Sequence, residues 1–165
     1  MANDAGLKSR TALITGAAGG IGLELTRLLA VDGCHLVMVG RDRARLEDVK
    51  AQLETKHRIS ARCYARDLSE SRAAFHLWAD LTAAGITVDV LVNNAGVGLY
   101  GLLAEQDPDD LERMLQLNMA ALTTLTRLAL PGMRRQRWGR ILNVASLVAY
   151  QRVATENLYS TTPGR

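Results

Sequence analysis

The stretch that decides the fold reads TALITGAAGGIG and occupies residues 11–22. Its first five residues favour a buried strand, and a glycine-rich turn follows them. Glycines allow a tight turn and a close backbone approach to a pyrophosphate, and the helix behind them offers free N–H groups. The pattern favours a dinucleotide-binding turn over a plain strand-to-helix turn, although methyltransferases also use such a turn. The expected cofactor contacts in this stretch are Thr15, Gly16, Ala18, Gly20, Ile21 and Gly22.

Short apolar runs alternate with amphipathic stretches along the rest of the chain. We expect strands at 11–15, 35–39, 59–65, 88–92 and 140–145. We expect a first helix that ends near 31, helices at 43–56, 69–84 and 107–136, and a last helix that begins near 156. Ser69 and Asp107 are the expected N-caps. This order predicts an α/β fold, a Rossmann-like doubly wound parallel sheet, in a single NAD(P)-binding domain over residues 1–165. The ligand is expected at the C-terminal strand ends.

The second and third strands end in residues that suit the adenosine half of a dinucleotide. Arg41 follows the second strand, and an arginine there accommodates a ribose 2′-phosphate, whereas the carboxylate of Asp42 would suit a free 2′-hydroxyl. Because the arginine comes first, the sequence favours NADP, with NAD as the alternative. Asp67 ends the third strand, beside Leu68, and would bond the adenine amino group or cap the next helix.

The fourth strand ends in Asn93-Asn94-Ala95-Gly96. Amides and a glycine at that edge can tie neighbouring strands together and line the cofactor site, while a bare turn is the alternative. We therefore include Asn94, Ala95 and Gly96 among the cofactor-binding candidates.

Taken in this order, the motifs TGxxxGIG, NNAG and a serine with a tyrosine thirteen residues later resemble the short-chain dehydrogenase/reductase family. The resemblance implies an NAD(P)(H)-dependent oxidoreductase of an alcohol or carbonyl compound. It implies that Asn118 holds a proton-relay water, that Ser146 orients and polarises the substrate carbonyl, and that Tyr159 is the general acid or base. It also implies a homo-oligomer formed partly through the helix near 118–135.

The chain departs from the family pattern after Tyr159. The family has lysine four residues later, and this chain has Pro163. A lysine there would lower the pKa of the tyrosine, which ordinarily lies near 10. Family members also run on for about eighty residues, so we expect a C-terminally truncated member that lacks the substrate-binding part and has impaired catalysis. The alternatives are a non-catalytic dinucleotide-binding remnant or an unstable truncated product.

Composition restricts the other function classes. The net charge is only +3, and the arginines at 134–140 lack interleaved aromatic residues beyond Trp138, which argues against nucleic-acid binding. No apolar run reaches the length of a membrane span, and the three histidines show no metal-ligand spacing. Cys34 and Cys63 are expected to be buried thiols in a reducing compartment. These features predict a cytoplasmic protein with a small-molecule substrate, no membrane or nucleic-acid partner and no metal.

Overall fold

A computed structural model describes residues 6–146 of the chain. Its centre is a five-stranded sheet with the order β3-β2-β1-β4-β5, and every pair of neighbouring strands is parallel. The strands are β1 (Thr11–Thr15), β2 (His35–Gly40), β3 (Ala61–Ala65), β4 (Val90–Asn93) and β5 (Arg140–Asn143). The sequence-based prediction of a Rossmann-like doubly wound sheet is therefore confirmed.

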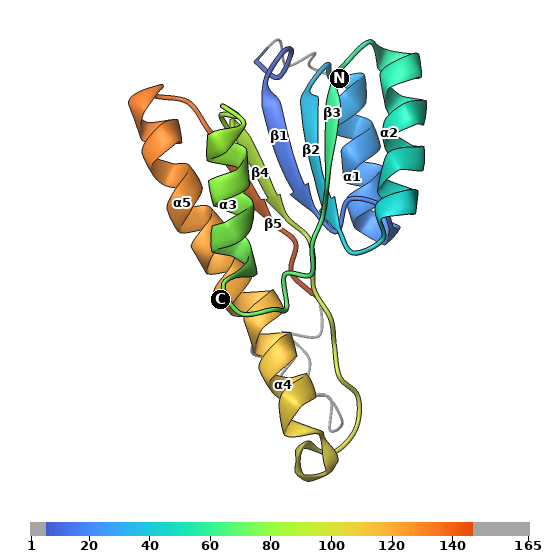
Figure 1. Ribbon diagram of the computed structural model, residues 1–165, viewed down its shortest axis with the longest axis vertical. Helices are drawn as coiled ribbons and strands as arrows, with labels where there is room; N and C mark the ends of the chain where they lie inside the picture. The colour runs from blue at the N-terminus through green and yellow to red at the C-terminus, as the bar shows by residue number, and fades with distance from the viewer. Residues whose placement is uncertain (1–5, 147–165) are drawn as a thin grey trace.

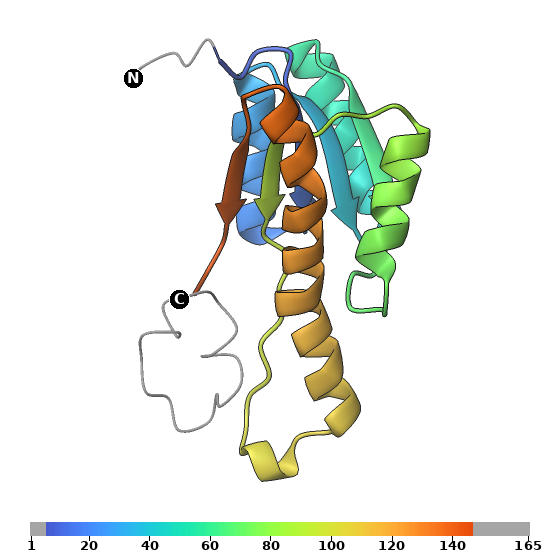
Figure 2. The ribbon, with the colours of Figure 1, turned by 90° about the vertical axis from the view of Figure 1, so that its left-hand side faces the viewer.

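Helices cover both faces of this sheet. The α-helices are α1 (Gly20–Val31), α2 (Arg43–His57), α3 (Ala73–Ala83), α4 (Pro108–Leu115) and α5 (Leu122–Arg135). A short 3-10 helix spans Leu103–Glu105, and a π-helical segment spans Gln116–Ala121. Figure 1 shows α1 and α2 on one side of the sheet and α3 and α5 on the other. The segment that holds α4 extends beyond the carboxyl ends of the strands, as Figure 2 also shows.

Two apolar clusters, one on each face, hold the layers together. Ile14 and Met38 pack on the side of α1 and α2. Leu13 and Val39 belong to the cluster that includes residues of α3 and α5. Successive side chains of a strand point to opposite faces, so strands that are apolar throughout supply both clusters.

The predicted cap at Asp107 is confirmed. Its carboxylate accepts a hydrogen bond from the backbone N–H of Asp109 at 2.9 Å, and Pro108 opens α4. The prediction that Ser69 caps the third helix is wrong. The helix begins only at Ala73, after Arg72 in a left-handed conformation (φ 61°). Ser69 instead donates its backbone N–H and its hydroxyl to Asp67, which holds the chain in a turn before the helix.

Four strands differ from the expected bounds. The second ends at Gly40 rather than at 39. The third strand begins at Ala61 rather than at 59, the fourth runs Val90–Asn93 rather than 88–92, and the fifth ends at Asn143 rather than at 145. Pairing partners set these limits: Leu36 pairs with Ala61, and Asn93 pairs with Asn143. Both cysteines are free thiols, Cys34 buried and Cys63 half-buried. The helix expected near 156 lies outside the described residues.

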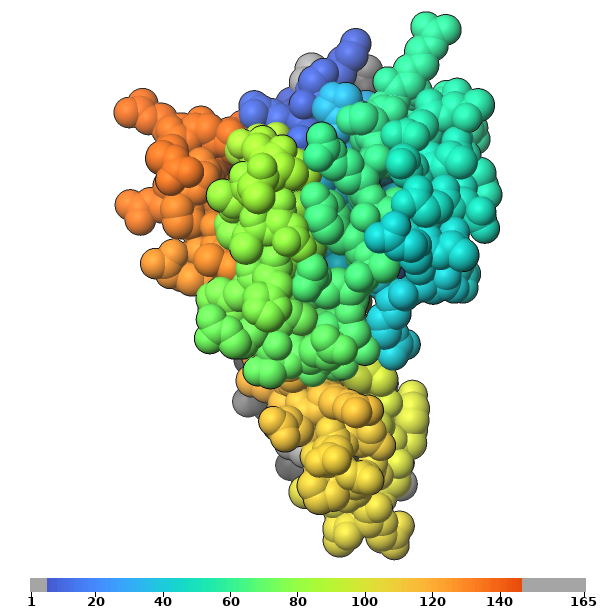
Figure 3. Space-filling view, viewed as in Figure 1, coloured from blue at the N-terminus to red at the C-terminus, as the bar shows by residue number. Residues whose placement is uncertain are grey.

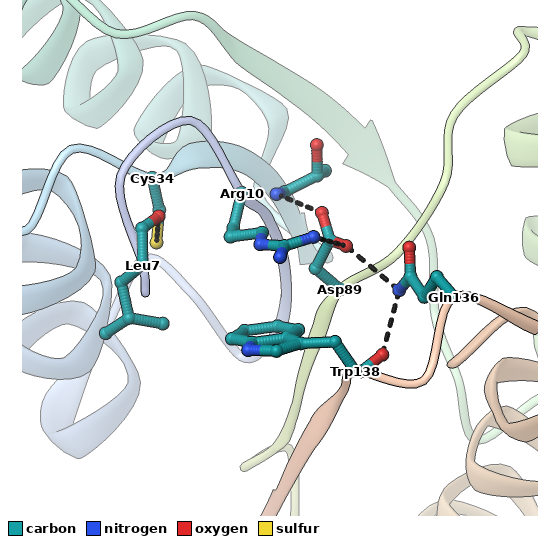
Figure 4. Close-up of polar contacts among 7 residues, drawn as sticks. Leu7, Arg10, Cys34, Asp89, Gln136 and Trp138 are labelled. Carbon is teal, nitrogen blue, oxygen red and sulfur yellow. Dashed lines mark hydrogen bonds and ion pairs between the residues drawn. The ribbon is translucent and has the colours of Figure 1, made fainter. Parts of the chain in front are cut away.

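A polar cluster at the amino ends of the strands joins β1, β4 and the turn before β5. Asp89 accepts hydrogen bonds from the backbone N–H of Thr11 at 2.9 Å and from Gln136 Nε2 at 3.0 Å. It also pairs with Arg10 at 3.2 Å, and the guanidinium of Arg10 lies 4.2 Å from the ring centre of Trp138. Figure 4 shows the Arg10 and Gln136 side chains converging on the Asp89 carboxylate, with the Trp138 ring beside Arg10. The cluster links three strands at the end of the sheet away from the glycine turn.

None of the helices in the part of the chain that the structure describes is long and apolar enough to cross a membrane.

Candidate functional site

The glycine turn between β1 and α1 is shaped by close packing against its surroundings. Gly16 has φ +67°, in the left-handed region that favours glycine. A Cβ at Gly22 would collide with the Gly16 carbonyl and the Asn94 amide. By contrast, a Cβ at Gly19 or Gly20 would meet nothing within 4 Å. The turn is therefore tight on its inner side and open on its outer side.

Thr15 and Asn94 tie this turn to the end of β4. The Thr15 hydroxyl accepts hydrogen bonds from the backbone N–H groups of Asn94 and Ala95, both at 3.0 Å, and donates to the Val92 carbonyl at 3.3 Å. The Asn94 amide donates to the Thr15 carbonyl at 3.0 Å and to the Gly16 carbonyl at 3.4 Å. The ends of β1 and β4 are thus held at a fixed separation, as the asparagine motif leads one to expect.

A first pocket, of about 360 Å³, opens beside this turn. It lies at the carboxyl ends of β1 to β4 and is bordered on the far side by α4. The lining residues are Gly16, Val39, Gly40, Arg41, Arg66, Asp67, Leu68, Ser69, Ala95, Gly96, Val97, Leu99, Asp110, Arg113 and Leu117. Its size and mixed apolar and charged lining suit a flat heterocycle with polar substituents.

Asp67 is the most perturbed carboxyl of this pocket. Burial by itself raises the pKa of Asp67, but hydrogen bonds from Ser69 and the positive charges of Arg41 and Arg113 together bring it below its ordinary value. Asp67 therefore stays ionised at neutral pH and presents a hydrogen-bond acceptor to the pocket.

Asn118 lies in the π-helical segment and grips the loop that follows β4. Its side chain accepts a hydrogen bond from the Val97 N–H at 3.0 Å and donates one to the Val97 carbonyl at 2.8 Å. The residue is 9% exposed. Isolated π-helical turns inside α-helices frequently occur at functional sites.

The space-filling view shows the body of the molecule, from which the segment with α4 projects (Figure 3).

A second pocket, of about 470 Å³, adjoins the first on the side of β5. The two share Ala95 and Gly96. Its lining residues are Ile21, Asn93, Asn94, Ala95, Gly96, Asn118, Met119, Leu122, Thr123, Asn143, Val144, Ala145 and Ser146. Asn93 lies beneath it and donates to Thr126 Oγ1 at 3.1 Å and to Asn143 Oδ1 at 3.0 Å. The two pockets form one elongated site along the strand ends.

The structure brings most of the sequence-predicted site residues together. Those in the first pocket are Gly16, Arg41, Asp67, Leu68, Ala95 and Gly96, and those in the second are Ile21, Asn94, Ala95, Gly96, Asn118 and Ser146. Four others, Thr15, Ala18, Gly20 and Gly22, line neither pocket; Thr15 and Gly22 act through the packing described above. Tyr159 lies outside the described residues.

Sequence reasoning missed several residues of the first pocket. Asp110 and Arg113 come from α4, and no sequence motif brings that helix to the ends of β2 and β3. Arg66 directly precedes Asp67 at a strand end, and that position was a usable signal. Within residues 6–146, no group of three or more His, Cys, Asp or Glu side chains is arranged to hold a metal ion.

Comparisons with known proteins agree with this geometry. The family model described as short chain dehydrogenase matches residues 10–163. A fatty acyl-CoA reductase of Acinetobacter baylyi is 35% identical over 86% of this chain and 48% of its own length. A probable NADP-dependent dehydrogenase of Haemophilus influenzae is 34% identical over 94% of this chain and 61% of its own. The chain thus spans about half to three fifths of these relatives.

Among solved structures, a metagenomic short-chain oxidoreductase in complex with NADP superposes with a TM-score of 0.88. It is 33% identical, and the match covers 95% of this chain and 70% of that one. Sequence and structure thus agree over nearly the whole of the described fold. A family match that begins at the first strand and takes in every described strand and helix establishes that this chain belongs to the short chain dehydrogenase family.

Proposed function

We propose that this chain is an NADP(H)-dependent oxidoreductase by descent, acting on an alcohol or carbonyl compound, whose turnover is impaired by the residue at 163. The observation that carries the first part is the pair of adjoining pockets along the strand ends, which meet at Ala95 and Gly96. An elongated site with a glycine turn between its two ends suits a dinucleotide, with adenosine in the first pocket and nicotinamide in the second.

The residues present fit such a cofactor. The outer side of the turn at Gly19 and Gly20 is open, which leaves room for a pyrophosphate against the start of α1. Asp67 stays ionised and would accept a hydrogen bond from the adenine amino group. Arg41 is exposed at the pocket rim, follows β2, and would bind a ribose 2′-phosphate. NADP is therefore favoured over NAD, in keeping with the NADP bound to the metagenomic structure.

The chemistry assigned to the chain's own residues concerns the carbonyl oxygen and its proton. When bound, the nicotinamide supplies or accepts the hydride. Ser146 lines the second pocket and would donate a hydrogen bond to the substrate carbonyl oxygen. Tyr159 would protonate that oxygen in reduction and remove the proton in oxidation. Asn118, through its grip on the Val97 backbone, would keep the second pocket open and hold a relay water.

Pro163 stands where the family resemblance calls for a lysine, and it favours a second candidate function. Without a nearby cation, a tyrosine with a pKa near 10 is about one part in a thousand phenolate at neutral pH. Tyr159 would then rarely be the phenolate base that oxidation needs, and in reduction it would be a weaker acid than a tyrosine whose pKa is lowered. The second candidate is therefore a dinucleotide-binding protein that retains the cofactor site and has no useful turnover.

One experiment tests both candidates. NADPH is titrated against the purified chain by fluorescence, and carbonyl reduction is followed by loss of NADPH absorbance for the wild type, Pro163→Lys and Pro163→Lys with Tyr159→Phe. We expect NADPH binding in all three and a rise in turnover only in the single variant. Rapid turnover by the wild type would refute the impairment. Absence of NADPH binding to the folded wild type would refute the cofactor assignment. Binding with no turnover in any variant supports the second candidate.

We further propose a small-molecule substrate, a cytoplasmic location, and a homo-oligomer formed partly through α5, without membrane or nucleic-acid partners. Met119 and Leu130, in and after the π-helical segment, are 47% and 39% exposed, which suits a helix that packs against another subunit. Sedimentation analysis of the wild type and of a Leu130→Asp variant would test the homo-oligomer. A monomeric wild type would contradict it.

A further inference from the structure

Arg66 is a second arginine at the rim of the first pocket, next to Arg41. Gly40 of β2 pairs with Ala65 of β3, and the next residues along the two parallel strands are Arg41 and Arg66. The backbone N–H of Arg66 also donates to the Gly40 carbonyl at 2.8 Å, which continues the pairing to this point. Neighbouring strands lie about 4.8 Å apart, so the two arginines start from adjacent places.

The two side chains leave the sheet on the same face. Val39 and Tyr64, two residues before Arg41 and Arg66, both pack on the side of α3 and α5. Because side chains alternate between faces with a period of two, Arg41 and Arg66 point to that side as well. Both line the first pocket.

Arg66 is held in place, and one of its donors has no partner among residues 6–146. Its Nη2 pairs with the Asp80 carboxylate of α3 at 2.6 Å. Its Nε atom is buried and makes no hydrogen bond with any residue that the structure describes. A buried donor without an acceptor is costly, and an anionic ligand oxygen is the acceptor that a guanidinium binds best. Arg41 makes no ion pair with any other described residue, so its guanidinium is also available.

We propose that Arg66, oriented by Asp80, is a second specificity-determining residue that binds the ribose 2′-phosphate together with Arg41. The inference rests on the proposed function, since it concerns the cofactor of the same site. A single arginine at the end of β2 suffices to accommodate that phosphate. Two guanidinium groups on one face, one of them fixed by a carboxylate, bind a dianion more tightly and discriminate more strongly against a free hydroxyl.

The test compares dinucleotides that differ only in the 2′-phosphate. NADPH and NADH are titrated by fluorescence against the wild type, Arg66→Gln and the matched control Arg62→Gln. Arg62 lies on the same strand and face, four residues earlier, and does not line the pocket. Arg66→Gln should raise the Kd for NADPH about tenfold, because a charge-assisted hydrogen bond is lost, and change the Kd for NADH less than twofold. Arg62→Gln should change neither.

Two further variants keep the inference testable if Arg66→Gln does not fold, as judged by circular dichroism. Arg66→Lys retains the charge without the planar fork and should lose part of the preference for NADPH. Asp80→Asn removes the partner that orients Arg66 and should also weaken NADPH binding selectively. Calorimetric titration with 2′,5′-ADP and with ADP provides a readout free of the nicotinamide.

Three results would overturn the inference. The first is an unchanged ratio of the two Kd values in the Arg66 variants, and the second is an equal weakening of NADPH and NADH, which would indicate a structural ion pair only. The third is a wild type that binds neither dinucleotide, or NADH alone. That third result is seen in the wild type itself and refutes the proposed cofactor too, whereas the first two leave the proposed function standing.

Discussion

Gly22 is the glycine of the turn between β1 and α1 that leaves no room for a side chain. A Cβ there would overlap the carbonyl of Gly16 and the amide of Asn94, and both are fixed by hydrogen bonds. Thr26, one turn later in α1, donates to the Gly22 carbonyl within the helix at 2.7 Å and to the Ala17 carbonyl of the turn at 3.2 Å, and the second bond ties the helix to the turn. The requirement for glycine at this position is therefore steric rather than conformational.

We predict that Gly22→Ala destabilises the fold by about 3 kcal/mol, because the new carbon forces apart backbone groups that are already in contact. The matched control is Gly19→Ala, since a Cβ there meets nothing within 4 Å and the residue has φ −153°, an extended conformation open to any residue. Urea unfolding followed by tryptophan fluorescence measures both. Equal stability of the two variants would contradict the packing described here.

The two thiols make the stability of the chain depend on pH at the alkaline end. Burial, aided by the charge of Asp32, raises the pKa of Cys34 from 9.0 to about 11, and burial aided by Glu47 raises that of Cys63 to about 11. Below pH 9 the thiols are neutral in both the folded and unfolded states, so their full contribution to stability is present. Between pH 9 and 11 the unfolded thiols ionise first, and stability falls.

We therefore expect the free energy of unfolding to decline between pH 9 and 11, and to decline less steeply in a Cys34→Ala, Cys63→Ala double variant. Urea denaturation at pH 8, 9, 10 and 11 for both proteins provides the measurement. Parallel profiles for the two proteins would show that other groups cause the alkaline loss.

At the scale of the elements, the strands and most helices could be predicted from apolar runs and turn residues. The cap at Asp107, with proline behind it, located the start of α4 correctly. The start of α3 was misplaced because Asp67 binds Ser69 in a local turn, and the same side chains could equally have capped a helix. The π-helical segment was not predicted, because a segment of 6 residues is too short to be distinguished from α-helix by its apolar periodicity.

The π-helical segment places Asn118, whose side-chain amide hydrogen-bonds both backbone groups of Val97. We predict that Asn118→Ala costs about 1–2 kcal/mol of stability, because those backbone groups lose their partner. It should also make the loop at 97–106 more sensitive to proteolysis. Gln116→Ala, in the same segment, is the control and should change neither property. Limited proteolysis and urea unfolding measure the two effects. Loop cleavage at the wild-type rate in Asn118→Ala would show that the hydrogen bonds of Asn118 do not hold the loop.

At the scale of the whole molecule, the site residues on β1 and β4 were predictable because glycine turns and asparagine pairs are local signals. Arg66, Asp110 and Arg113 were not found, since their roles depend on where α3 and α4 settle on the sheet. Site residues can be predicted from the sequence when they directly follow a strand. A pocket wall contributed by a distant helix requires the three-dimensional arrangement.

The Asp89 cluster provides the matching prediction for the opposite end of the sheet. Asp89→Ala should destabilise the fold by about 2–3 kcal/mol, because the part-buried N–H of Thr11 and the guanidinium of Arg10 lose their acceptor and Gln136 Nε2 keeps only the Trp138 carbonyl. Asp48→Ala, an exposed acid on α2, is the control and should change stability by less than about 0.5 kcal/mol. Denaturant unfolding measures the difference. If Asp89→Ala is as stable as the control, the cluster does not hold the strands together.

β1 is only five residues long, yet it carries contacts at both ends of the sheet. Its first residue is bonded to Asp89, and its last is bonded to Asn94 and Ala95 beside the glycine turn. A shift of one residue along the sheet would therefore break both sets of contacts at once and exchange its two faces. One short strand thus couples the glycine turn mechanically to the opposite end of the sheet. A ligand that braces the turn should accordingly slow hydrogen exchange at the amide of Thr11, at the other end of the strand.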